Sequence, residues 1–149
     1  MDQSYNWFAI YHDVDESSWN SSKGLIEALK DLKIKIYTFS FQNPEKFKLP
    51  DKKYFMDRQI KVVLSFYAGK SKILEGELKR LKKELSILLV SELGDEPQTL
   101  INNNIRAEIS DLSLSPDKRS SLYWQNQGHN CLWFTHWADT KIFYPIERK

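Results

Sequence analysis

The sequence predicts an α/β fold built on a doubly wound, mostly parallel sheet. Six short apolar segments typical of strands alternate with four segments of helix length and one irregular excursion. No two strand segments are joined by the short glycine- or asparagine-rich turn that marks a hairpin. The 149 residues, of which 41% are hydrophobic and 28% charged, fit a single globular domain. We therefore expect one Rossmann-like domain over residues 1–149, with six strands and helices on both faces of the sheet.

The first part of the chain predicts one strand-helix-strand unit. Residues 7–11 form a continuous apolar and aromatic run, which suits a strand buried on both faces. Serine and asparagine in residues 17–22 are typical of the start of a helix, and leucine and isoleucine recur at helical spacing over residues 23–32. Residues 34–41 alternate with period two and predict the second strand.

Residues 42–59 interrupt this rhythm with Pro44 and Pro50. We expect an irregular surface segment with a short helix over residues 54–57, and the prolines make a strand at the sheet edge the weaker alternative. Regular structure returns after it. A third strand over residues 61–69 and a helix over residues 70–85 are expected.

The second part of the chain repeats the alternation of strand and helix. Three consecutive asparagines at 102–104 weaken the first of its helices but do not abolish the apolar spacing, and Gly128 closes the second. The expected elements are a strand over 87–91, a helix over 99–109, a strand over 111–115, a helix over 118–127 and a strand over 131–135.

Composition excludes several classes of protein. The net charge of +2 does not indicate a nucleic-acid-binding field, and the charges over residues 75–84 have mixed signs, as on a solvated helix face. Cys131 is the single cysteine and lies in an apolar run, which excludes an internal disulfide and predicts a buried, inert thiol. No apolar run is long enough to span a bilayer, so we expect a cytoplasmic protein without a membrane span.

Ionisable residues gather directly after the predicted strands. Because the carboxyl ends of parallel strands share one edge of the sheet, these residues are expected to converge there. The ionisable ones are His12, Asp13, Asp15, Lys70, Glu92, Asp95, Glu96, Asp117, His136 and Asp139, and Gly69, Gly94, Gln98 and Trp137 lie among them.

The structural alternative for each of these residues is a role in the loop itself. Asp95 and Glu96 precede an expected helix, where their charge is favourable without any ligand, and Pro97 suits a first helical turn. His136, among aromatic residues, is equally compatible with a core position. His12, Asp13 and Asp15 form only a weak metal pattern, and glycine-rich nucleotide loops, zinc-protease motifs and serine-hydrolase motifs are absent.

Several motifs together resemble the N-terminal domain of CgeB-like (spore maturation protein type) glycosyltransferases, which are GT-B enzymes. The most distinctive is Gly94-Asp95-Glu96-Pro97-Gln98-Thr99. The others are Asn104, Arg106 and Ala107, the segments 111–117 and 133–145, Tyr123, Gly128, and Asp15 with residues 19–24.

This resemblance implies one half of a GT-B fold. Such enzymes have two Rossmann-like domains, with the acceptor commonly on the first and the nucleotide-sugar donor on the second, and they usually need no metal. Residues 137–149 are then the exit segment towards a second domain. A donor-binding domain or a partner chain is expected to complete the enzyme, with a sugar or another hydroxyl compound as acceptor and no bound cofactor of its own.

The resemblance also implies roles for residues at the sheet edge. Asp95 or Glu96, and after them His136, are expected to be the base that deprotonates the acceptor, so Glu96→Gln should lose activity with little loss of folding. Residues expected to contact substrate are Asp15, Trp19, Asn20, Gln98, Thr99, Asp117, Trp137 and Asp139, with Trp19 or Trp137 stacking on a sugar.

A non-catalytic interaction module of the flavodoxin or receiver type is the alternative. It would use the same edge of the sheet to bind a partner. The receiver version is the weaker one, because it requires an aspartate at the end of the third strand, where this chain has Tyr67-Ala68-Gly69-Lys70.

Overall fold

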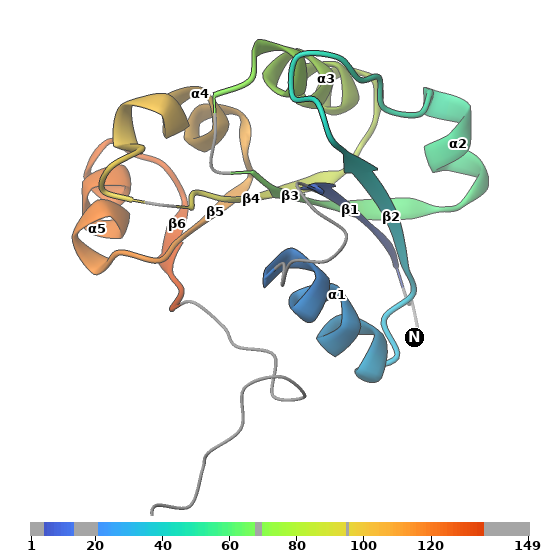
Figure 1. Ribbon diagram of the computed structural model, residues 1–149, viewed down its shortest axis with the longest axis horizontal. Helices are drawn as coiled ribbons and strands as arrows, with labels where there is room; N and C mark the ends of the chain where they lie inside the picture. Colours follow the sequence, from blue (N-terminus) through green and yellow to red (C-terminus); the bar gives the residue numbers. More distant parts are fainter. Residues whose placement is uncertain (1–4, 14–20, 68–69, 95, 136–149) are drawn as a thin grey trace, which may run out of the picture.

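The computed structural model describes residues 5–13, 21–67, 70–94 and 96–135, and it confirms the predicted α/β class. Figure 1 shows the sheet with helices on both of its faces. The elements are β1 (Asn6–His12), α1 (Ser21–Asp31), β2 (Ile36–Phe41), α2 (Lys52–Asp57), β3 (Ile60–Phe66), α3 (Lys72–Glu84), β4 (Leu88–Glu92), α4 (Leu100–Ile109), β5 (Leu112–Ser115), α5 (Lys118–Asn126) and β6 (Cys131–Trp133).

The six strands form one sheet in the order β2-β1-β3-β4-β5-β6. All five strand pairs are parallel, so every strand ends at the same edge. The chain moves outward from β1 to β2 and then crosses back to β3 on the other side of β1. This reversal between β1 and β3 is the topological switch point of a doubly wound sheet.

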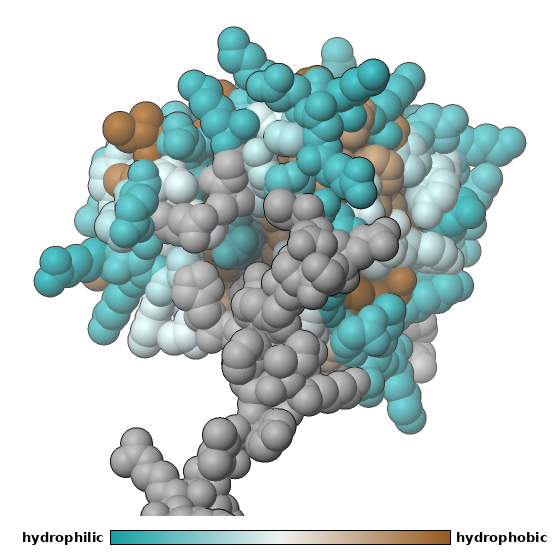
Figure 2. Space-filling model, in the orientation of Figure 1, coloured by the Kyte–Doolittle hydropathy of each residue, from teal (hydrophilic) through white to brown (hydrophobic). Residues whose placement is uncertain are grey.

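Successive residues of β1 pack into hydrophobic clusters on opposite faces of the sheet. Phe8 and Ile10 of β1 pack with α2 and α3, whereas Ala9 faces α1. A third cluster joins β6 to α4 and α5 through Ala107, Trp124 and Cys131. Helix α1 therefore covers one face, and α2 to α5 cover the other (Figure 1). Figure 2 shows a largely hydrophilic outer surface with isolated hydrophobic side chains.

Three helices begin with side-chain caps. Asp51 accepts a hydrogen bond from the Tyr54 N–H at the start of α2, and Ser71 caps α3 in the same way. At the end of α5, Gly128 has a φ of 87°, which confirms the expected left-handed position. None of the helices in the described parts of the chain has the length and apolar character needed to cross a membrane.

The interpretation of Pro97 as part of a first helical turn is wrong. Helix α4 begins at Leu100, and Pro97 lies before it in a turn that contains a cis Glu96–Pro97 peptide bond. Thr99 occupies the position that precedes the helix, but its side chain makes no capping hydrogen bond. Glu96 is consequently not a helix-terminal charge, and its contacts are of a different kind.

Candidate functional site at the carboxyl edge of the sheet

Four of the predicted site residues lie in the described structure, and all four are on the loops that follow β4 and β5. They are Glu96, Gln98, Thr99 and Asp117. The predictions for the remaining site residues lie outside the described residues: Asp15, Trp19, Asn20, Asp95, His136, Trp137 and Asp139.

Glu96 is buried and receives hydrogen bonds from three side chains. Its Oε1 accepts from the indole N–H of Trp124 at 2.8 Å and from the amide of Asn103 at 3.0 Å. Its Oε2 accepts from the hydroxyl of Ser115. Only 7% of Glu96 is exposed, and both of its carboxylate oxygens accept hydrogen bonds from the protein. These bonds connect the loop to α4, β5 and α5. The geometry favours a structural role for Glu96, through side-chain hydrogen bonds rather than through the helix-terminal charge expected from the sequence.

Asn103 extends this network towards Arg106. Its Oδ1 accepts a hydrogen bond from the Arg106 guanidinium, and its amide also donates to the Thr99 hydroxyl at 3.1 Å. Neither Asn103 nor Arg106 is more than 1% exposed. The buried Asn103 amide therefore joins α4 to the loop, and the buried Arg106 guanidinium bonds to that amide from within the helix.

Acidic side chains surround the buried guanidinium of Arg106. Burial lowers the pKa of its guanidinium, and the charges of Glu92, Glu75, Tyr67 and Glu96 act against that shift. The guanidinium carbon lies 6.0 Å from the centre of the Tyr67 ring. Arg106 thus links the carboxyl ends of β3 and β4 to the Glu96 network.

The outer part of the loop is more accessible. Gln98 is exposed, and Thr99 is half-buried with its hydroxyl donating to the Gly94 carbonyl at 2.6 Å. The Gln98 side chain is therefore presented to the outside of a loop whose backbone is held from within.

Asp117 follows β5 and caps α5. Its carboxylate accepts from the Ser120 N–H at 2.7 Å, and this bond lowers the pKa of Asp117. Because a carboxylate can accept more than one hydrogen bond, capping leaves Asp117 able to bind a hydroxyl group as well. Its predicted contact with substrate stays a prediction.

Aromatic contacts join β1, β2 and β3 at the other half of the edge. The His12 imidazole stacks on Phe41 with ring centres 5.2 Å apart and meets the Tyr67 ring edge-on at 5.4 Å. Its Nε2 lies 2.9 Å from the Gln42 carbonyl. Next to it, Asp13 pairs with Lys23 of α1 at 3.0 Å. These contacts assign His12 and Asp13 to the packing of the switch point.

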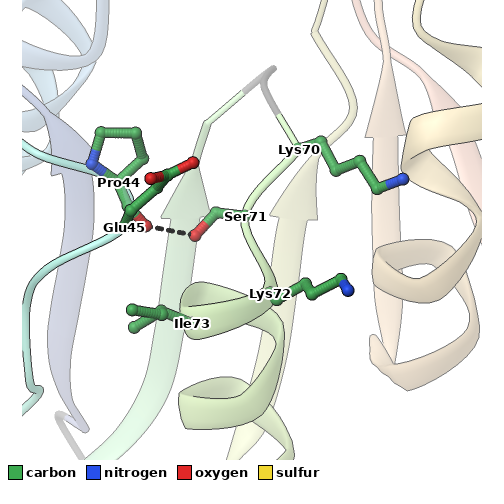
Figure 3. A pocket seen from close by; sticks show the side chains of 6 residues that line it. All are labelled: Pro44, Glu45, Lys70, Ser71, Lys72 and Ile73. Atoms are coloured by element: carbon green, nitrogen blue, oxygen red, sulfur yellow. Dashed lines mark hydrogen bonds between the residues drawn. The ribbon is translucent and has the colours of Figure 1, made fainter.

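A pocket of about 350 Å³ lies between the loop after β2 and the start of α3 (Figure 3). The Ser71 hydroxyl donates to the Pro44 carbonyl at 2.6 Å across it. Figure 3 shows the Lys70 and Lys72 side chains directed away from Pro44 and Glu45, so the lysines do not converge on one point. None of the predicted site residues lines this pocket.

Cys131 is buried in the α5 face of β6, as predicted for an inert thiol. Burial, together with the nearby Glu96 carboxylate, raises the pKa of its thiol to about 11. Within the described residues, His, Cys, Asp and Glu side chains form no group of three or more suited to a metal ion.

Three buried residues that organise this edge, Asn103, Arg106 and Trp124, were not predicted to belong to the site, although Arg106 is one of the motif residues. One signal was present: Asn103, Arg106 and Ala107 share one face of α4 at spacings of three and four residues. Ile101, on another face of the helix, is 90% exposed. Apolar spacing alone therefore does not identify the buried face of this helix.

No protein-family model, curated protein or solved structure matches the chain. The geometry of the sheet edge and the motif residues of the sequence are accordingly the features that bear on function.

Proposed function

We propose that the chain is the acceptor-side half of a GT-B type glycosyltransferase. It would transfer a sugar from a nucleotide-sugar donor only together with a second Rossmann-like, donor-binding domain or partner chain. One observation carries the proposal: Glu96, Arg106 and Ser115, from three separate motif segments, belong to one hydrogen-bonded network at the carboxyl edge. That edge is where open α/β sheets bind ligands.

The hydrogen bonds of the network support separate roles for Glu96 and for the proposed base. We assign to Glu96 the positioning of the loop, because both of its oxygens already accept hydrogen bonds from protein groups. The proposed base is then Asp95 or His136, and it would remove the proton from the acceptor hydroxyl as the sugar is transferred. Gln98, Thr99 and Asp117 would contact the acceptor.

A non-catalytic interaction module of the flavodoxin or receiver type is the second candidate. The strand order β2-β1-β3-β4-β5 favours it, since this is the order of the flavodoxin-like doubly wound sheet. Likeness of fold alone does not establish function. The two candidates differ in chemistry: the transferase half requires a donor domain, and the module does not.

Reconstitution with a donor-binding half tests the proposal. The chain is combined with the α/β domain encoded next to it or after it in the same genome, and nucleotide release from a panel of nucleotide-sugars is measured with and without acceptors. We expect release only when both halves are present, loss of it in Asp95→Asn or His136→Ala, and little change in the control Glu108→Gln on the exposed side of α4. Failure of every combination to bind or turn over a nucleotide-sugar would favour the interaction module.

A further inference from the structure

Trp133 is an exposed tryptophan at the same sheet edge as the Glu96 network. It ends β6 and is the register partner of Ser115, whose hydroxyl bonds to Glu96. About half of Trp133 is exposed (51%), although it lies in a strand. Figure 1 shows β6 and α5 side by side at the end of the sheet.

The indole ring is held in place by its own polar atom. Its N–H donates to the Pro116 carbonyl at 3.2 Å, which fixes the ring against the loop between β5 and α5. Tryptophan side chains often combine an apolar body with one satisfied hydrogen bond in this way at binding surfaces. A ring fixed before binding loses little conformational entropy when a ligand packs on it.

A charged side chain lies over the Trp133 ring, and a second charged residue is its neighbour in the sequence. The Lys118 ammonium lies 5.6 Å from the ring centre, and Asp117 precedes it with its carboxylate at the start of α5. The three side chains thus offer an aromatic face, a hydrogen-bond donor and an acceptor. A few directed polar groups around an aromatic surface are typical of small-molecule sites.

We propose that Trp133, Lys118 and Asp117 form a binding platform for a pyranose ring of the acceptor. The C–H-rich face of a pyranose is apolar and carries partial positive charge, so it complements the negative face of the indole. The sugar hydroxyls would accept from Lys118 and donate to Asp117. This inference rests on the proposed function and moves the stacking role from Trp19 or Trp137 to Trp133.

Direct sugar binding tests the platform without any donor half. Cellotetraose, chitotetraose and maltotetraose, each at about 10 mM to detect millimolar affinities, are added to the chain, and saturation-transfer NMR is recorded. We expect transfer to the ring C–H protons of at least one probe and a loss of affinity of about tenfold in Trp133→Ala. Trp133→Phe should retain part of the binding. Leu132→Ala, the neighbouring exposed residue on the opposite face, is the matched control, and circular dichroism verifies folding of each variant.

The outcomes separate this inference from the proposed function. Absence of binding for all three probes, or equal binding by Trp133→Ala and the unaltered chain, overturns the platform, even if a reconstituted complex transfers sugar. Binding that depends on Trp133 supports the platform even if no donor half yields transfer. A Trp133→Ala variant that binds the sugars normally but no longer associates with a donor half shows that the ring is a protein contact and also overturns it.

Discussion

The indole N–H of Trp124 donates a hydrogen bond of 2.8 Å to Oε1 of Glu96, across 28 residues of sequence. Both residues are buried, and the bond connects the loop after β4 with helix α5. A buried carboxylate stabilises the fold only while it accepts its hydrogen bonds, because a buried acceptor without a donor is costly. Substitutions of Glu96 and of its hydrogen-bond donors should therefore change the stability of the fold.

Replacing Glu96 by glutamine should destabilise the fold by about 2 kcal/mol, because the hydrogen bonds to a charged acceptor weaken and the new amide brings two donors among existing donors. Urea unfolding followed by tryptophan fluorescence measures the change. From the sequence we expect Glu96→Gln to leave folding nearly intact, and the same measurement decides between the two predictions. Glu108→Gln, at an exposed position of α4, is the control. Equal stability of the two variants would return Glu96 to the list of candidate bases.

The three consecutive asparagines of α4 should respond in opposite directions to alanine. Asn103→Ala removes bonds to Glu96, Thr99 and Arg106 and should cost about 3 kcal/mol. Asn102→Ala and Asn104→Ala, both exposed, should stabilise the helix by up to about 0.5 kcal/mol, since alanine is the better helix former. Chemical denaturation distinguishes them. Similar effects at all three positions would contradict the network.

The Asp111 carboxylate should stabilise the fold only at pH values at which it is ionised. Burial would raise the pKa of Asp111, but hydrogen bonds from Lys82 and from the Leu89 N–H at 2.7 Å lower it below the ordinary 3.8. The folded protein therefore releases this proton more readily than the unfolded chain does. The stabilisation is complete above about pH 4 and is lost as the pH falls through the folded pKa.

The corresponding variant is Asp111→Asn, which should cost about 1 kcal/mol near neutral pH and progressively less as the pH falls below 3.8. Unfolding in urea at several pH values follows this difference. Asp57→Asn, at an exposed position of α2, controls for the change in net charge. A penalty that stays constant down to the acid limit would show that the Asp111 carboxylate is not the cause.

Two glycines should give opposite signs when changed to alanine. A Cβ at Gly76 or at Gly128 would meet no atom within 4 Å, so space does not decide either result. Gly76 lies on the exposed side of α3, where alanine should add about 0.5–1 kcal/mol of stability. Gly128, with φ at 87°, should lose about 1 kcal/mol. Thermal unfolding of both variants compares them, and a gain in Gly128→Ala would contradict the left-handed conformation.

Much of the fold follows from local patterns in the sequence. Buried apolar runs identified the strands, and helical spacing identified α1, α3 and α4, because both patterns reflect which side chains must leave water. The short helix α2 was also predicted, and the structure shows that Asp51 caps it. The buried thiol of Cys131 and the left-handed position of Gly128 follow from their immediate neighbours in the same way.

The sequence by itself determined the class of the fold and the edge at which polar residues gather, since parallel strands place their carboxyl ends together. Only the tertiary structure revealed that Glu96 is buried and hydrogen-bonded, because its donors Asn103, Ser115 and Trp124 come from three other elements. The same holds for the buried side of α4, which is polar and is satisfied by partners distant in sequence. Hydrogen bonds between distant residues leave no periodic pattern, so their partners become apparent only when the chain is folded.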